Sequence, residues 1–348
     1  MHSIYAPQFT LTPRLLSGIA AIERTAWLIE HMLLMPKHEA WIQREVAVKR
    51  AAGTTAIEGV GLPEREVAAL QAKGAGIGET EAEQANINAL RAYGFIDYLS
   101  SQDDVPIDEL AIREMNRQFL LGAADVLTPG AYRRGQNTIN DFMPPNQGDV
   151  PSLMRGFGLW LREPDNSVNP VILAGLAHLH LVAVHPFWDG NGRTARGLAA
   201  LIIQRSPISC KNLLSLDSVF AANRDGYVAA IEQTLGSAFS NTYDATPWLE
   251  FFVRGVKTAT DLLEHELTDW HRTMAKFQAQ VRNLGLKQRQ IDALAFASRA
   301  RILTRREYME IADVKELTAT RDLADLVQRR LLVAQGQTRN RTYTWNAG

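Results

Sequence analysis

Apolar residues recur every three or four positions along most of this 348-residue chain, and this periodicity restricts the possible folds more than any other feature. One such run contains Leu15, Ile19, Ile22, Leu28, Ile29 and Leu33. The spacing collects apolar side chains on one face of an α-helix, whereas the alternation typical of β-strands is scarce before residue 330. We therefore predict a mainly α protein.

The last part of the chain has a different pattern. Three helices and then two short strands are expected near 287–298, 304–312, 318–331, 333–335 and 341–345, and the third helix opens at Thr318 or Thr320. Three helices followed by a hairpin predict a winged helix-turn-helix. This part also carries twelve Lys or Arg against seven Asp or Glu from residue 287 onward, a surplus of +5 in a chain whose net charge is −1.

These patterns divide the chain into four segments. We expect an N-terminal helical region at 1–104, a core at 105–255, a helical connector at 256–285 and the C-terminal module at 286–348. Within the core, Gly, Asn and Pro residues follow one another at short intervals from Gly130 to Pro145. This stretch predicts turns and short extended segments between helices.

Composition excludes several classes of protein. With 46% apolar and 22% charged residues, the chain is similar to soluble globular proteins and unlike disordered or fibrous ones. The single cysteine, Cys210, cannot form an intramolecular disulfide, and we find neither a secretory signal nor an apolar run of membrane-spanning length. We therefore expect a cytoplasmic protein that does not enter a membrane.

Two residues in a short polar segment are suited to acid–base and metal chemistry. His185 follows an apolar helix and titrates near neutrality, which makes it a candidate general base for a hydroxyl group. Asp189 offers the hard oxygen ligand that Mg²⁺ prefers.

The residues that follow are suited to binding phosphate. Gly190-Asn191-Gly192 can turn several amide N–H groups toward an anion at the start of the next helix. Arg193 and Arg196, in the first turn of that helix, bring guanidinium groups to the same point. Together with His185, these groups predict nucleotidyl or phosphoryl transfer to a hydroxyl.

The complete motif at 185–196, His-Pro-Phe-Trp-Asp-Gly-Asn-Gly-Arg-Thr-Ala-Arg, resembles the signature of the Fic family and matches all nine of its fixed positions. Other positions that fit the family pattern are Ala177, His178, Val184, Arg224, Trp248, Phe251 and Phe252. The resemblance implies a Fic-type helical core with a short β-hairpin flap.

The resemblance implies a protein adenylyltransferase, which passes AMP from ATP, bound with Mg²⁺, to a Ser, Thr or Tyr hydroxyl of a protein target or of itself. It assigns the hydroxyl proton to His185, Mg²⁺ to Asp189, the α-phosphate to Gly190, Asn191 and Gly192, and the outer phosphates to Arg193. Fic-like proteins that transfer phosphate carry other residues in place of the two glycines, so AMP transfer is favoured. Family habit also implies a homodimer.

The resemblance places further contacts on both sides of the motif. The target would add as an extra strand to the flap, at Gln136, Asn137, Thr138 and Ile139. The adenine side of the nucleotide would lie near Asn223 and Tyr227.

Residues 54–59, Thr-Thr-Ala-Ile-Glu-Gly, resemble the inhibitory motif of the family through Thr54, Glu58 and Gly59. The implied logic is competition, because a Glu58 carboxylate paired with Arg196 would occupy the place of the γ-phosphate of ATP. The simpler alternative is a helix end capped by Gly59. With the complete catalytic motif downstream, we favour inhibition.

Three alternatives stay open. His178, His180, His185 and Asp189 could form a metal-hydrolase cluster, but their spacing lacks the helical pair that such enzymes use, and His178 is expected to be a buried support for the loop. The same Fic site could instead remove AMP from a modified protein.

The third alternative is a nucleotide-sensing DNA-binding regulator. Arg321, Arg329 and Arg330 could meet DNA phosphates, but Asp322 and Asp325 share their helix and would oppose them. We therefore favour protein docking as the use of the C-terminal module.

Overall fold

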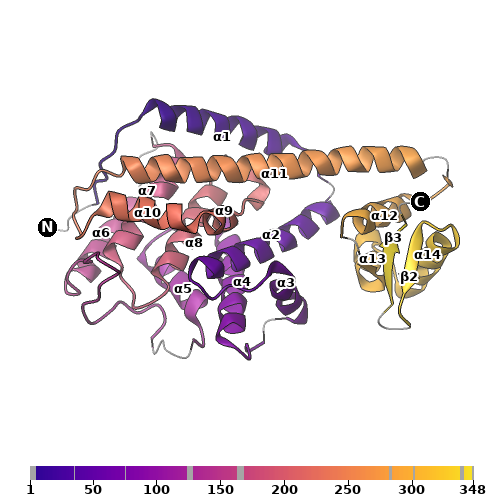
Figure 1. Cartoon of the computed structure of the whole chain (residues 1–348), viewed down its shortest axis with the longest axis horizontal. Coiled ribbons are helices and arrows are strands. Elements are labelled where there is room, and N and C mark those ends of the chain that lie inside the picture. The colour runs from indigo at the N-terminus through magenta and orange to yellow at the C-terminus, as the bar shows by residue number, and fades with distance from the viewer. Residues whose placement is uncertain are drawn as a thin grey trace. The chain divides into compact units, whose positions relative to one another are not determined.

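The computed structural model describes residues 5–34, 36–74, 76–123, 128–162, 168–281, 284–300, 302–337 and 341–346. Within them the chain is mostly helical, with one three-stranded sheet, as expected from its apolar periodicity (Figure 1). It divides into two compact units, Met1–Leu33 with Ala40–Glu264 and Leu34–Glu39 with His265–Gly348. None of the described helices is both long and apolar enough to cross a membrane.

The first unit holds almost all of the helices. They are α1 (Pro13–His31), α2 (Pro36–Ile57), α3 (Glu64–Lys73), α4 (Glu81–Ser100), α5 (Glu109–Leu120), α6 (Val150–Arg162), α7 (Pro170–Val184), α8 (Asn191–Gln204), the 3-10 turn η1 (Cys210–Asn212), α9 (Leu216–Ala222), α10 (Arg224–Leu235) and the start of α11 (Thr246–Val281). The single helix α11 continues into the second unit, so the expected boundary between core and connector at 255 lies inside it.

The helices α7 and α8 form the centre of the first unit. Asn169 caps the start of α7 through its side chain, and Pro170 occupies the first turn, where it needs no hydrogen-bond partner for its nitrogen. Nearly every residue of α7 is buried, because other helices cover it on all sides. The two helices pack against each other, and α8 also contacts α4 and α5.

A cluster of aromatic rings joins α7, α9, α10 and α11. Trp248 is fully buried, stacks on His178 at 4.7 Å between ring centroids, and donates its indole N–H to the Gly175 carbonyl at 2.8 Å. This close packing requires glycine at position 175, because a β-carbon there would lie 2.8 Å from Leu249 Cδ2. This contact sets the distance between α7 and α11.

The second unit contains α12 (Gln288–Ala300), β1 (Leu303–Thr304), α13 (Arg305–Ala312), α14 (Glu316–Gln328), β2 (Leu332–Gln335) and β3 (Thr342–Trp345). The strands form an antiparallel sheet in the order β1-β3-β2. The two expected strands are present, whereas β1 was not expected. It is only two residues long, and its pairing partner Thr342–Tyr343 is far away in the sequence.

The third helix of this unit begins at Glu316, earlier than the expected start at Thr318 or Thr320. No side chain caps it, and the buried residues Ala319, Leu323 and Leu326 fix its position instead. Packing against the rest of the unit therefore overrides the local capping signal.

Asp322 and Asp325 lie on α14, as expected, and both bind basic or amide side chains of the same unit. Asp322 is 4% exposed, and its carboxylate accepts hydrogen bonds from Arg289 at 2.6 Å and from the Tyr308 hydroxyl at 3.1 Å. Asp325 pairs with Arg329 and with Gln290. Both carboxylates are thus engaged within the unit, and Asp325 pairs with Arg329, one of the arginines considered for DNA phosphates.

The aromatic cluster yields a stability prediction. Replacing Trp248 by Ala is expected to lower the free energy of unfolding by about 3 to 5 kcal/mol, because it leaves a large cavity and removes the partner of the Gly175 carbonyl. Chemical denaturation followed by circular dichroism measures this. Trp27, which is 60% exposed, is the matched control. A Trp27→Ala loss as large as that of Trp248→Ala would contradict the assignment of the core.

Candidate active site

The polar motif forms the turn between α7 and α8. His185 ends α7 in a left-handed backbone conformation (φ 49°), and its amide donates to the Leu181 carbonyl at 3.0 Å. Gly190 begins α8, also with positive φ (73°). A β-carbon at Gly190 would lie 3.0 Å from the Asn116 amide and 3.1 Å from Leu120, so the turn requires glycine for both reasons.

His185 is held as a neutral imidazole. Its Nδ1 lies 3.4 Å from the Val182 carbonyl, which can only accept, so the proton is on Nδ1 and the lone pair is on Nε2. Burial lowers the pKa of His185 from 6.5 to about 4, the Val182 bond opposes this, and the charge of Arg133 lowers it further. At neutral pH the ring is therefore able to accept a proton.

Asn191 shapes the loop between the two helices. Its side-chain oxygen accepts from the Phe187 amide and its side-chain nitrogen donates to the Phe187 carbonyl, both at 2.9 Å. Phe187 is buried and anchors the loop in the core. The side chain of Asn191, which the sequence placed on a phosphate, is thus also the brace of the loop.

Asp189 and Arg193 lie together at the surface end of the motif. The carboxylate of Asp189 accepts from the Gly190 amide at 2.6 Å and from Arg193 at 2.8 Å. Half of the Asp189 side chain is exposed, whereas that of Arg193 is 9% exposed. A single accessible carboxylate fits Mg²⁺, which usually binds one or two protein carboxylates and takes its other ligands from water and from substrate phosphates.

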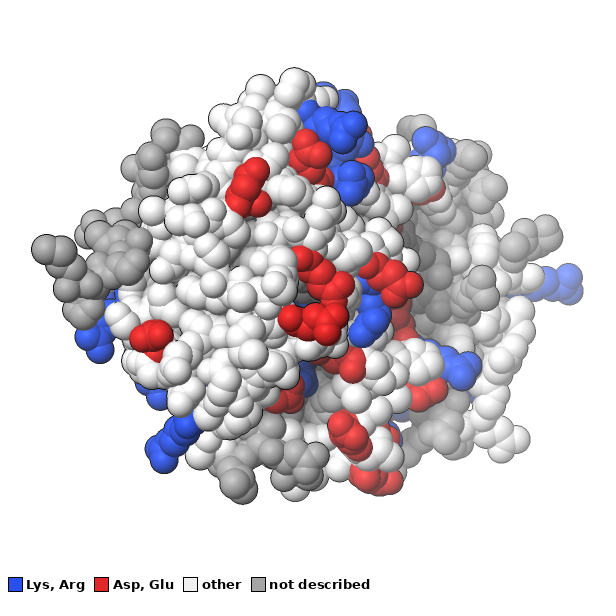
Figure 2. Space-filling view, turned by 60° about the vertical axis from the view of Figure 1, so that its left-hand side comes forward, with Lys and Arg blue, Asp and Glu red and all other residues white. Residues whose placement is uncertain are grey.

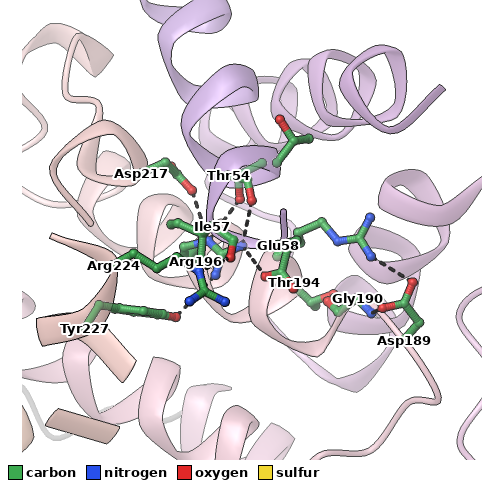
Figure 3. A network of polar contacts seen from close by, with 12 residues as sticks. Thr54, Ile57, Glu58, Asp189, Gly190, Thr194, Arg196, Asp217, Arg224 and Tyr227 are labelled. Carbon is green, nitrogen blue, oxygen red and sulfur yellow. Dashed lines mark hydrogen bonds and ion pairs between the residues drawn. The ribbon is translucent and has the colours of Figure 1, made fainter. Parts of the chain in front are cut away.

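Arg196 points inward from α8 and is 3% exposed (Figure 3). Its guanidinium donates to the Thr54 hydroxyl at 2.9 Å, to the Thr54 carbonyl at 3.1 Å and to Glu58 at 2.7 Å. It also lies 3.3 Å from the Asp217 carboxylate and donates to the Tyr227 hydroxyl at 3.3 Å. The structure therefore brings Thr54 and Glu58 together with Arg196 across 138 or more positions of sequence.

The Glu58 carboxylate lies over the first turn of α8. A β-carbon on Gly192 would be 2.8 Å from Glu58 Oε1 and 3.1 Å from the guanidinium of Arg196. Glycine at this position therefore leaves room for an anionic group at the positive end of the helix. Glu58 occupies that room.

Gly59 places Glu58 at the end of α2. The Val60 amide donates to the Thr55 carbonyl and the Gly59 amide donates to the Ala56 carbonyl, both at 3.1 Å, with Gly59 at φ 83°. This pattern is a Schellman cap. The cap that we considered as an alternative to inhibition is therefore present, and it aims Glu58 at Arg196.

The two residues expected near the adenine differ in solvent exposure. Asn223 is exposed at the start of α10. Tyr227 is 4% exposed, stacks on Phe220, and shares its hydroxyl with His178 Nε2 at 2.9 Å. The structure thus places Tyr227 beneath Arg196, inside the aromatic cluster, and not on a surface that a base would cover.

The expected flap is a short turn with little strand structure. Ile139 and Phe142 form one antiparallel bridge around Asn140, whose φ is 50°. Met143 at its far end bridges to Ala238. Along Gln136–Ile139 the side chains alternate between exposed and half-buried, as in an extended segment.

A buried arginine ties the flap to the motif. Arg133 is 2% exposed and donates to the carbonyls of His185, Gly135 and Pro145, while its own amide donates to Pro186. The same guanidinium therefore holds both the expected flap and the backbone of His185, which fixes the distance between them.

Sequence reasoning missed two residues of this site, Asp217 and Asn116, and named Arg224 only as a position that fits the family pattern. Asp217 is buried beside Arg196, Arg224 donates to the Ile57 carbonyl at 2.7 Å, and Asn116 bonds the Asp189 carbonyl, Thr194 and the Gly130 amide. Asn116 had a signal, since it is a polar residue within the apolar face of α5. Asp217 had none, because its partner Arg196 is distant in the sequence.

The alternative of a metal hydrolase finds no support. Within the described part of the chain, no group of three or more metal-ligating side chains is present. His178 and His180 are buried, and burial lowers the pKa of His180 to about 3. Each histidine bonds a tyrosine hydroxyl, Tyr227 for His178 and Tyr243 for His180.

Figure 2 shows that uncharged side chains cover most of one face of the molecule, with acidic and basic ones in small groups.

The lowered pKa of His185 has a measurable consequence. In the unfolded chain the ring takes up a proton near pH 6.5, but in the folded chain only near pH 4. The stability that this residue contributes is therefore complete above pH 6.5 and is lost as the pH falls toward 4. An NMR titration of the His185 ring is expected to show a midpoint well below 6, and a midpoint near 6.5 would contradict its burial.

Comparison with known proteins agrees with this geometry. A model of the Fic/DOC family matches residues 106–203. The chain is 44% identical to protein adenylyltransferase Fic of Drosophila mojavensis and of Drosophila grimshawi over 96 residues. These residues make up 27% of this chain. The match spans only about a fifth of the length of those relatives, 19% and 20%.

Solved structures share the fold. A Fic family protein from Desulfovibrio desulfuricans G20 aligns over 99% of both chains with a TM-score of 0.65 and 19% identity. Fic-1 from C. elegans aligns over 74% of this chain and 73% of its own with a TM-score of 0.61 and 24% identity. Residues 106–203 of this protein therefore match the Fic/DOC family model, and the chain shares the fold of these solved structures.

Proposed function

We propose that this protein transfers AMP from ATP to a Ser, Thr or Tyr hydroxyl of a protein target, and that Glu58 inhibits this activity. The observation that carries the proposal is the position of the neutral His185 ring. It lies at one end of a glycine turn, and the other end of that turn leads into the positive N-terminus of α8. A base and an anion site one turn apart are the two parts that nucleotidyl transfer needs.

In the proposed reaction, the target hydroxyl oxygen forms a bond to the α-phosphorus of ATP. The bond from that phosphorus to the bridging oxygen of pyrophosphate breaks, and pyrophosphate leaves. His185 Nε2 takes the hydroxyl proton, and its Nδ1–H bond to Val182 keeps the ring in the required tautomer. The backbone amides of Gly190 and Gly192 and the start of α8 hold the developing negative charge, with Asn191 fixing their loop.

Asp189 would hold Mg²⁺ together with the substrate phosphates. When bound, the ion neutralises phosphate charge during transfer. Arg193, which pairs with Asp189 in this structure, would turn to the outer phosphates once the carboxylate binds the ion.

Inhibition follows from the place that Glu58 occupies. Its carboxylate lies at the N-terminus of α8 and pairs with Arg196, where the γ-phosphate of ATP would otherwise bind. A nucleotide that cannot reach Arg196 binds with its α-phosphate out of line with the target oxygen. Since Glu58 belongs to the same chain, this inhibition needs no separate inhibitor protein.

The flap would bind the target. The backbone of Gln136, Asn137, Thr138 and Ile139 follows the extended pattern described above, and Arg133 ties it to His185. An extended target segment added here as a strand would present every second side chain toward the base.

We propose the C-terminal unit to be a winged helix that docks a protein partner. The order of its helices and strands supports this fold. DNA binding remains the alternative, and a salt-dependent shift of duplex DNA by the protein would favour it.

The Glu58→Gly variant is expected to transfer AMP about 10 to 100 times faster than the wild-type protein, because hydrogen bonds to charged groups contribute about 1.5 to 3 kcal/mol. Adding His185→Ala to this variant is expected to lower the rate by about 100- to 10,000-fold. Mass spectrometry after incubation with ATP and Mg²⁺ detects the AMP adduct on the protein itself.

Glu66→Gly is the matched control, since Glu66 is an exposed acid outside the site. Equal AMP incorporation by Glu58→Gly and wild type would overturn the proposed inhibition. A phosphate adduct in place of AMP would change the reaction class. Loss of AMP from a modified protein only in the wild type would favour AMP removal as the main activity, with Glu58 positioning a water.

A further inference from the structure

Arg196 lies between two carboxylates that differ in their surroundings. The Asp217 carboxylate is 3.3 Å away, and its side chain is 3% exposed. The Glu58 carboxylate is 2.7 Å away, and its side chain is 31% exposed. One counter-ion is therefore sealed in the protein, and the other lies at the edge of the site.

The position of Asp217 is fixed by close backbone packing. It lies in the first turn of α9, where Gly53 of α2 approaches so closely that a β-carbon would be 2.7 Å from the Ser218 nitrogen and 2.8 Å from the Asp217 carbonyl carbon. The residue next to Gly53 is Thr54, which also bonds Arg196. The backbone of Asp217 therefore cannot move away from Arg196 without separating α2 from α9. Its side chain, which is 3% exposed, has no solvent to turn toward.

Glu58 is held less tightly. It follows the last residue of α2, and the cap described above satisfies the end of the helix through Thr55, Ala56 and Gly59 rather than through the Glu58 side chain. Its carboxylate can therefore rotate away while α2 and its cap stay in place.

A buried guanidinium without a counter-charge is strongly destabilising, because the protein interior solvates it poorly. If Glu58 were its only carboxylate, each release of Glu58 would leave Arg196 in that state until another anion arrived. With Asp217 in place, the charge is balanced throughout the exchange.

We infer that Asp217 is the permanent counter-ion of Arg196 and that Glu58 is the exchangeable one, so that Glu58 can give way to the terminal phosphate of a nucleotide while Arg196 stays charged and in position. The inference rests on the proposed function only for the identity of the incoming anion. Asp217 is thus a positioning residue that acts through Arg196, and it sets how easily inhibition is relieved.

A double-mutant cycle on the full chain tests this. Asp217→Asn and Glu58→Gln each leave Arg196 with one carboxylate, whereas the double variant leaves it with none. The melting temperature of the double variant is expected to fall by more than the sum of the two single losses. ATP is expected to restore more of that loss than ADP, because only ATP supplies the γ-phosphate.

Asp97→Asn is the matched control. Asp97 pairs with another buried arginine, Arg50, at 3.0 Å, so its loss is expected to add simply to that of Glu58→Gln. If the double variant of Asp217 and Glu58 does not fold, Asp217→Asn is measured in an Arg196→Met background. There its cost is expected to disappear, because the charge that Asp217 balances is gone.

Additive losses in the first cycle, or an undiminished cost of Asp217→Asn without Arg196, would overturn the inference. These outcomes are independent of the proposed function. If neither ATP nor ADP raises the melting temperature of any variant, nucleotide binding fails, while a non-additive cycle still establishes the two counter-ions.

Discussion

The charge of Arg196 is the constraint around which the site is built. A guanidinium that is 3% exposed must find all of its partners inside the protein, and it finds them on three other helices or their ends. Thr54 and Glu58 come from the end of α2, Asp217 from α9 and Tyr227 from α10. These segments lie far apart in the sequence, so this one charge draws together the parts of the first unit that surround the start of α8.

Under the proposed function, the same arrangement connects nucleotide binding with inhibition. The N-terminus of α8 attracts an anion because of its free amides and its positive end, and in this structure that anion is the carboxylate of Glu58. His185 lies on the other side of the turn, where burial lowers its pKa to about 4 and keeps the ring neutral at pH 7. A carboxylate of the same chain therefore already fills the space at the positive end of α8.

Much of this could be predicted from the sequence, for a physical reason. The residues from His185 to Arg196 are contiguous, and a turn between two helices brings contiguous residues together whatever the rest of the fold does. Helical periodicity likewise gave the fold class and the helices of the second unit, because it reports which face of each helix is buried. The predicted start of α14 was wrong, because packing rather than a capping residue decides where this helix begins.

The sequence by itself determined the helical fold, the base, the glycine turn and, through its resemblance to a known family, the pairing of Glu58 with Arg196. Only the tertiary structure decided that Tyr227 lies beneath the arginine, that Asn116 and Arg133 brace the loop and the flap, and that Asp217 is a second counter-ion. Such contacts join residues that lie tens of positions apart in the sequence. Local pattern records how a segment folds, whereas the partner of a buried charge depends on which segments the whole fold brings next to it.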